Sequence, residues 1–274
     1  MKIYISFDIE GVTGITNRFD IDEDASSFSI AQRLATGDVN AAVKGALEAG
    51  AEEIYIYDGH GFKRNNILFE NLHPKAKLIR GRLETPGYNL LALDESFNAV
   101  FFIGWHARPS SPGILSHCYH PDVFLEWRVN GKPVGEPELS AAYAGLMELP
   151  VVLFTGDDRS CEEVKRWNPK CECVVTKFEL DREAGICIPA ERSRQNIKEG
   201  AIHALKRLGE IDPFTFKMPV VIEADTIFDH QAAAISLIPG VNRKSDRTII
   251  FKSSDYTEAF NALLAITILA IQAQ

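Results

Sequence analysis

The 274-residue sequence has few cysteines and no long apolar run, and each shortage limits the class of protein it can encode. Its five cysteines are odd in number and include no Cys-x-x-Cys pair, which argues against a disulfide framework and a zinc ribbon. The most apolar stretch, residues 262–271, is far shorter than the roughly 20 residues that span a membrane. Asp8 and Glu10 interrupt the N-terminal region before a signal-peptide apolar run could form. We therefore expect a cytoplasmic protein without a membrane partner.

Positive charge is also scarce. The 29 Lys and Arg residues are outnumbered by 38 Asp and Glu residues, for a net charge of −9. This balance argues against a nucleic-acid partner, which would require a basic face. No internal repeat, low-complexity tract or Gly/Ser linker divides the chain. With 46% hydrophobic and 24% charged residues, the composition is that of a globular protein with one large or two small domains.

Short β-rich apolar runs alternate along the chain with segments of helical spacing. The predicted strands are 2–7, 53–57, 77–79, 99–103, 151–154, 172–177, 218–224 and 248–252. A β-hairpin is predicted at 124–129 and 132–134, since Asn130-Gly131 suits a type I′ turn. The predicted helices are 30–49, 138–147, 189–208 and 256–270. This alternation predicts an α/β fold with a largely parallel sheet, flanking helices and a second, smaller α/β domain. We expect residues 1–185 to form a metal-binding catalytic domain and residues 186–274 to form the second portion.

Three predicted strands end in side chains that bind metals. Asp8 and Glu10 share one face at the end of strand 2–7. His60 follows the second strand in Asp58-Gly59-His60-Gly61, and His106 follows strand 99–103 in Gly104-Trp105-His106. In open α/β sheets, ligands bind outside the carboxyl ends of the strands. These carboxylates and imidazoles predict a site for one metal ion, or for two that share a carboxylate, and hence hydrolysis.

Further candidates are less specific. His117 follows a loop rich in Pro, Ser and Gly, so it is either an acid–base, nucleophilic or oxyanion-binding residue or simply part of a strand that begins at Ser116. Glu136 precedes a helix, where the helix dipole alone favours a carboxylate. Three other carboxylates are alternative candidates for the site: Asp58, Asp157 and Asp158. Asp158 also suits the N-cap of a helix. The histidines expected to lie outside the site are His73, His120, His203 and His230.

Taken together, these motifs resemble the M55 family of zinc D-aminopeptidases. Their order and rough spacing match over essentially the whole chain. The motifs are Ser6-x-Asp8-x-Glu10-Gly11, Asp58-Gly59-His60, Gly104-x-His106-Ala107-Arg108, Pro112-Gly113-x-x-Ser116-His117 and Val134-Gly135-Glu136.

The resemblance implies a complete site and an activity. It implies that His117 is the catalytic histidine. It also implies that each subunit binds two zinc ions and that Asp8 bridges them. The implied ligands are Asp8, Glu10, His60, His106 and Glu136. Members of the family release N-terminal residues, including D-alanine, from short peptides. They assemble as decamers of two stacked pentameric rings of two-domain α/β subunits.

The residues also permit two other functions. A binuclear metal phosphoesterase could use the same strand-end ligands, but it would be expected to have a phosphate-binding glycine-rich turn or a basic cluster, whereas only Arg108 adjoins the ligands. A non-enzymatic α/β protein could bind a small acidic ligand or a metal in the same loops. The favoured prediction is a metal-dependent aminopeptidase.

Overall fold

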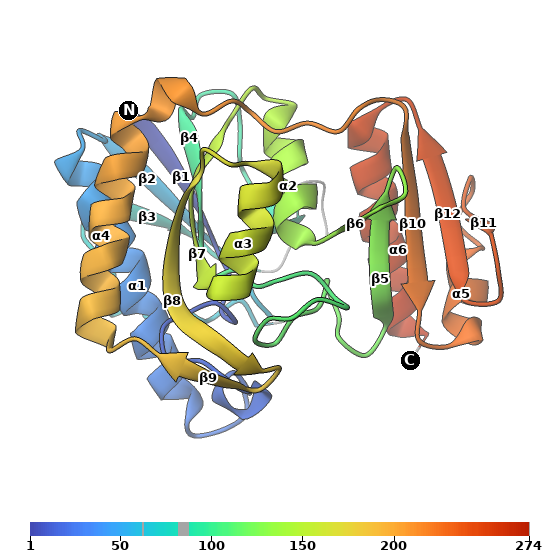
Figure 1. The fold of residues 1–274 in the computed structure, drawn as a ribbon, viewed down its shortest axis with the longest axis horizontal. Coiled ribbons are helices and arrows are strands. Elements are labelled where there is room, and N and C mark those ends of the chain that lie inside the picture. Colours follow the sequence, from blue (N-terminus) through green and yellow to red (C-terminus); the bar gives the residue numbers. More distant parts are fainter. Residues whose placement is uncertain (62, 82–87, 274) are drawn as a thin grey trace.

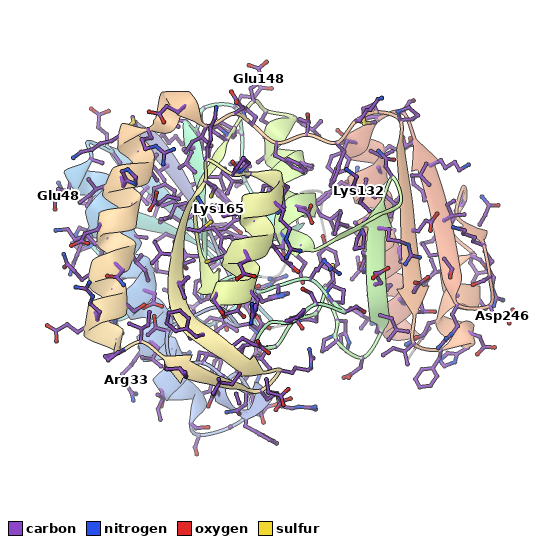
Figure 2. The ribbon with its side chains drawn as sticks, viewed as in Figure 1. Arg33, Glu48, Lys132, Glu148, Lys165 and Asp246 are labelled. Carbon is purple, nitrogen blue, oxygen red and sulfur yellow. The ribbon has the colours of Figure 1, made fainter. Side chains whose placement is uncertain are left out.

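Two β-sheets lie side by side in the computed structural model, which describes residues 1–61, 63–81 and 88–273 (Figure 1). The larger sheet has the strand order β3-β2-β1-β4-β7-β8-β9, and the smaller has the order β11-β12-β10-β5-β6. Figure 2 shows that charged side chains such as Glu48 and Asp246 project from the outer surface at opposite ends of the molecule.

The larger sheet is parallel except for its last strand, β9, which pairs antiparallel with β8. Apart from β9, which was not predicted, its strands match the predicted apolar runs, and β4 is buried along its whole length. This sheet confirms the predicted fold class. Its strands are β1 (Lys2–Phe7), β2 (Glu53–Asp58), β3 (Ala76–Ile79), β4 (Ala99–Ile103), β7 (Val151–Asp157), β8 (Glu172–Asp181) and β9 (Ala184–Cys187).

Helices cover both faces of the larger sheet. On one face, α1 (Phe28–Glu48) and α4 (Ala190–Lys206) pack against each other and over Ile3 and Ile5 of β1. On the other face, α2 (Glu136–Gly145) and α3 (Asp158–Trp167) bury their small and apolar residues with Tyr4. The alternating side chains of one strand thus serve two separate apolar layers.

The smaller sheet is antiparallel throughout its described pairs. The predicted hairpin is present, and positive φ angles at Asn130 and Gly131 form its turn. One face of the sheet packs against α5 (Asp229–Ile235) and α6 (Tyr256–Gln272) around Trp127 and Phe260. Its strands are β5 (Phe124–Val129), β6 (Lys132–Val134), β10 (Val220–Thr226), β11 (Asn242–Arg243) and β12 (Thr248–Ser253).

The expected boundary at residue 185 does not separate these two sheets. The β5–β6 hairpin lies in the first range but belongs to the smaller sheet, whereas α4 lies in the second range but packs on α1. The reason is that the chain crosses to the smaller sheet at β5, returns for α2 to α4, and crosses again before β10 (Figure 1).

Local differences from the predicted elements are small. Helix α2 begins at Glu136, two residues before the expected start, because Glu136 supplies the first helical turn after Gly135. Residues 116–118 form no strand. The described short 3-10 helices are η1 (Arg18–Asp20), η2 (Phe69–Asn71), η3 (Tyr88–Leu90) and η4 (Leu208–Glu210). Within the described ranges, no helix combines the length and the apolar character needed to cross a membrane.

Candidate metal centre

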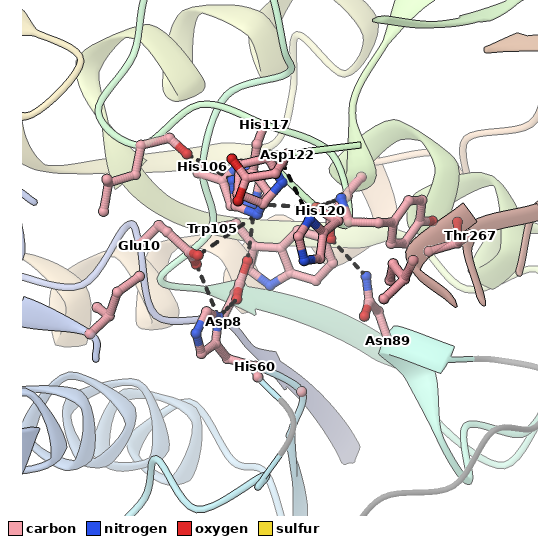
Figure 3. A pocket seen from close by; sticks show the side chains of 18 of the residues that line it. Asp8, Glu10, His60, Asn89, Trp105, His106, His117, His120, Asp122 and Thr267 are labelled. Carbon is pink, nitrogen blue, oxygen red and sulfur yellow. Dashed lines mark hydrogen bonds and ion pairs between the residues drawn. The ribbon is translucent and has the colours of Figure 1, made fainter. Parts of the chain in front are cut away.

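The ends of three parallel strands bring the predicted ligands together (Figure 3). Asp8 follows β1 and lies between two histidines: its Oδ1 is 3.0 Å from His60 Nδ1, and its Oδ2 is 3.4 Å from His106 Nε2. Glu10 also approaches His60, with Oε2 3.2 Å from Nδ1. Because β2 and β4 flank β1, the residues that follow these strands meet at one edge.

Glu136 and His117 complete the cluster from outside the parallel strands. Glu136 Oε1, at the start of α2, is 3.4 Å from His106 Nε2. His117 Nε2 is 3.8 Å from Glu10 Oε1, and its ring stacks on that of His106 with centroids 4.1 Å apart. All six side chains line one cavity of about 380 Å³, called here the metal-site cavity. They form two groups whose possible ligand atoms lie within 4.8 Å of one another: Asp8, Glu10 and His60, and His106, His117 and Glu136.

Close backbone approach positions the loops that carry these residues. Gly11 N donates to Gly104 O at 2.7 Å, and the indole of Trp105 donates to Ser6 O at 3.0 Å. A Cβ atom at Gly11 would lie 2.0 Å from Trp105 O. The loop after β1 therefore rests directly on the loop after β4, and only glycine leaves room for this contact.

Replacing Gly11 by alanine is expected to destabilise the protein by about 1–3 kcal/mol or more, because the neighbouring backbone cannot give way as a flexible side chain could. Gly209→Ala is the matched control, since a Cβ there meets no atom within 4 Å. Urea unfolding monitored by fluorescence gives both free energies of unfolding. Equal stability of the two variants would contradict the packing described here.

Strand β8 fixes the same loop from the other side. The buried Lys177 ammonium donates to the carbonyl oxygens of Glu10 and Val12, the latter at 2.9 Å. Thr176 Oγ1 donates to Gly11 O at 2.8 Å. Burial lowers the pKa of Lys177 to about 8, although nearby carboxylates oppose the shift. Three successive carbonyl groups are thereby held, which sets the direction of the Glu10 side chain.

Hydrogen bonds also fix the orientation of two imidazole rings. His106 Nδ1 is 2.9 Å from Ala107 O, and His117 Nδ1 is 2.8 Å from Leu115 O. Because a carbonyl oxygen can only accept, each Nδ1 is the protonated nitrogen of its ring. In the neutral form of each ring, Nε2 then turns a lone pair toward the cluster, as is typical of histidines that bind metals.

The carboxylates fit a bound cation. Asp8, Glu10 and Glu136 are only 8%, 3% and 6% exposed, so three acidic groups share a nearly solvent-free site. Among the described residues, the buried Oε2 of Glu10 has only an ion-pair contact, 3.2 Å from His60 Nδ1, and no partner with hydrogen-bond geometry. Buried charges require compensation, and this mixture of carboxylate oxygen and imidazole nitrogen is a donor set that zinc prefers.

The electrostatics of the cluster are strongly perturbed. Burial, reinforced by the charge of Glu10, raises the pKa of Asp8 to about 6. Burial opposes the protonation of His106, but its contacts with Glu136 and the other carboxylates raise its pKa to about 10. Burial and the neighbouring His106 lower the pKa of His117 to about 4. The pKa values of the two stacked rings are thus shifted in opposite directions, and perturbation on this scale is typical of functional sites.

Outer contacts support the cluster at Glu136. Its Oε1 accepts from Tyr119 N at 2.6 Å, and its Oε2 accepts from Asn89 Nδ2 at 3.2 Å. Such hydrogen bonds fix the orientation of a ligating carboxylate. The sequence pattern alone did not indicate Asn89.

The alternative carboxylates have structural roles. Asp58 accepts from the Asn66 backbone and side-chain amides at 2.8 and 2.6 Å, which holds the turn after His60. Asp157, rather than Asp158, is the N-cap of α3, because its Oδ1 accepts from Ser160 N at 2.7 Å. The prediction of an N-cap at Asp158 was therefore wrong by one residue.

The remaining histidines divide into two kinds. His203 on α4 pairs with Glu172 at 2.7 Å, and neither it nor His73 nor His230 is among the residues described as lining the metal-site cavity. His120, expected outside the site, is half-buried and lines that cavity. Its position three residues after His117, in the same loop, was the available signal.

The far wall of the metal-site cavity comes from the smaller sheet's helix α6. The residues of α6 that line it are Leu264, Thr267, Ile268, Ile271 and Gln272. Another part of the rim is held by Arg182, whose carbonyl accepts from Leu115 N at 2.8 Å and whose guanidinium donates to Ser116 O. The β8–β9 turn thereby holds the loop that carries His117.

Comparisons with known proteins match the chain over nearly its full length. The model of the family Peptidase_M55, described as D-aminopeptidase, matches residues 1–265. A D-aminopeptidase of Bacillus subtilis (strain 168) is 31% identical over 273 residues, covering 99% of this chain and 98% of that protein. The solved structure of the Zn-dependent D-aminopeptidase DppA from Bacillus subtilis, described as a self-compartmentalizing protease, aligns with a TM-score of 0.95. It is 30% identical, with 99% of this chain and 98% of that chain covered.

The fold, the strand-edge cluster and these likenesses define a metal-dependent aminopeptidase. The chain belongs to peptidase family M55. This assignment replaces the alternatives of a phosphoesterase and of a non-enzymatic binding protein.

Proposed function

We propose that the protein is a zinc aminopeptidase that holds two zinc ions per subunit and releases N-terminal residues, D-alanine among them, from short peptides. The observation that carries this proposal is the position of Asp8, whose two carboxylate oxygens face histidines on opposite sides. A carboxylate so placed can be shared by two ions. Relatives described as a D-aminopeptidase and as a Zn-dependent D-aminopeptidase support the metal and the substrate class.

We assign three protein ligands to each zinc ion. Asp8, Glu10 and His60 would hold one ion, and Asp8, His106 and Glu136 would hold the other. Three protein ligands and one open position are typical of catalytic zinc. Zinc supplies Lewis acidity, which polarises the peptide carbonyl and acidifies water.

His117 is the one residue of the six-residue cluster that is not a proposed ligand, and we propose it as the catalytic histidine. Its Nδ1 donates a hydrogen bond to Leu115 O, so Nε2, with its lone pair, is the ring nitrogen available to the substrate. We infer that Nε2 accepts a proton as the carbonyl is attacked and returns it to the departing amine. The stacking of its ring on that of His106 restricts the movement of this nitrogen.

The dimensions of the metal-site cavity support a short peptide as substrate. Its volume of about 380 Å³ lies within the range of small-molecule sites. The metal-binding residues line one part, and apolar side chains of α6 line another. A peptide carbonyl would face the ligands while an apolar side chain contacts Ile268 or Ile271.

A hydrolysis assay tests the proposal. The zinc-loaded protein is given D-alanyl and L-alanyl versions of the same dipeptide and tripeptide, with an N-acetylated peptide as control. We expect cleavage of the free D-alanyl peptides at the highest kcat/KM and no cleavage of the blocked peptide, because the amine must enter the site. A preference for the L-alanyl peptides would overturn the proposed chirality. Hydrolysis of a phosphate diester in place of both peptides would overturn the proposed activity.

We also propose that the subunits assemble into a homodecamer of two pentameric rings and act in the cytoplasm. The similar Bacillus subtilis structure is described as self-compartmentalizing. On the β8–β9 hairpin, Phe178, Leu180 and Ile186 are 45%, 65% and 58% exposed, and Phe178 is paired in register with Ile186. An exposed apolar patch of this kind is typical of a contact surface. The five free cysteines fit a reducing compartment.

A further inference from the structure

Three of the five cysteines gather on the outer side of the larger sheet, away from the metal centre. Cys161 lies on α3, Cys171 lies just before β8, and Cys173 is the second residue of that strand. All three cysteines pack in one apolar cluster, where Cys173 Sγ donates to Cys171 O at 3.7 Å. Helix α3 packs directly on β8, so Cys161 and Cys173 come from neighbouring elements (Figure 1).

Two of these thiols line a surface hollow, called here the thiol hollow. Its lining residues come from α3 and β8 and are Asp158, Cys161, Glu162, Lys165, Arg166, Cys173 and Val175. Cys173 is half-buried, whereas Cys171 is fully buried behind it. The described linings of the thiol hollow and of the metal-site cavity share no residue. The thiol hollow is therefore a separate place on the molecule that a small solute can enter.

The three sulfurs do not have the same acidity. The neighbouring thiols of Cys161 and Cys171, aided by the ammonium of Lys165, lower the pKa of Cys173 to about 4, although burial opposes the shift. The proximity of Cys173 and burial raise the pKa of Cys161 and of Cys171. Thiolate character at a partly exposed sulfur is the condition for reactivity toward oxidants.

We propose that Cys173 is a peroxide-sensitive site and that Cys161 converts its oxidised form into a disulfide linking α3 to β8. The Cys173 thiolate attacks one oxygen of a hydroperoxide. The O–O bond breaks, Cys173 becomes a sulfenic acid, and the other oxygen leaves and takes a proton from solvent. The Cys161 sulfur then attacks the Cys173 sulfur, so that an S–S bond forms and the S–O bond breaks, and water carries away the Cys161 proton. The two sulfurs lose two electrons, which reduce the peroxide.

Cys161 is a better partner for Cys173 than Cys171 is. Cys171 and Cys173 are two residues apart where the chain enters β8, and side chains at that spacing stand parallel on one face of a strand. Cys161 approaches from the facing helix α3, and it lines the thiol hollow together with Cys173. A disulfide requires two converging side chains.

Peptide mapping of the zinc-loaded protein tests the proposal. The reduced protein is treated with stoichiometric hydrogen peroxide, blocked with an alkylating reagent and digested without reductant. We expect a linked peptide pair containing Cys161 and Cys173 that weighs two hydrogen atoms less than its separate parts and disappears on treatment with dithiothreitol. A Cys171–Cys173 link, or earlier oxidation of the exposed Cys187, would overturn the proposal.

Serine variants separate the roles of the thiols. Cys161→Ser should abolish the disulfide and leave Cys173 as a sulfenic acid that dimedone traps, whereas Cys173→Ser should prevent both products. Cys171→Ser should still form the disulfide, and Cys187→Ser is the control for an exposed thiol elsewhere. If a variant fails to fold, the wild-type map decides by itself, because it identifies the linked sulfurs directly.

Discussion

Asp8→Asn is expected to lower kcat/KM for a D-alanyl peptide by at least about a thousandfold, because one substitution weakens both proposed zinc sites. Asparagine keeps the shape of the side chain but lacks the charge and one of the two oxygens that face His60 and His106. Zinc content after dialysis should fall together with activity. Metal analysis and steady-state kinetics on the same preparation check both expectations.

A surface carboxylate supplies the control for this experiment. Asp246 is exposed at the far end of the smaller sheet, so Asp246→Asn should keep wild-type zinc content and kcat/KM. Circular dichroism should show that both variants are folded. Full zinc occupancy with normal turnover in Asp8→Asn would show that this carboxylate does not bridge two ions.

His117→Ala is expected to keep its zinc and to lose turnover by about 10²–10⁴-fold, the range over which a positioned acid–base residue acts. The reason is that the other five residues would supply the proposed three ligands to each ion, whereas His117 Nε2 would accept and return the mobile proton. The loss should appear in kcat with little change in KM. Metal analysis beside a full kinetic comparison makes the measurement.

The same experiment can reject this role. His117 also lies within 4.8 Å of possible ligand atoms of His106 and Glu136. If His117→Ala loses zinc in parallel with activity, His117 is a ligand and the proton carrier must be sought elsewhere. His203→Ala, which changes a histidine paired with Glu172 on α4, should leave both properties intact.

The sequence predicted that Asp8, His60 and His106 meet, because parallel strands determine their positions. Asp8, His60 and His106 each follow a buried apolar run, and strands of a parallel sheet end at the same edge. Their convergence therefore follows from local pattern and one topological rule. His117 and Glu136 lie outside that rule: the sequence pattern marked them only as candidates, and the resemblance to the M55 family implied their roles.

Contacts between distant segments could not be predicted in the same way. The pairing of β5 with β10 joins residues about a hundred positions apart, and nothing in either strand specifies the other. For the same reason the chain order suggested a division at residue 185, although α4 packs on α1 and the hairpin crosses to the smaller sheet. The apolar pattern of α6 predicted a buried helix but gave no sign that one side lines a cavity.

Within one subunit, the residues proposed to carry out the reaction and the α6 residues that would contact the substrate side chain lie on different walls of the cavity. The side chains proposed to bind the ions belong to the larger sheet and its loops, and the opposite wall belongs to a helix packed on the smaller sheet. Natural variation in α6 can therefore reshape the range of accepted peptides while the reaction centre stays intact. Leu264, Ile268 and Ile271 are accordingly the positions to randomise when engineering the enzyme toward bulkier amino acids.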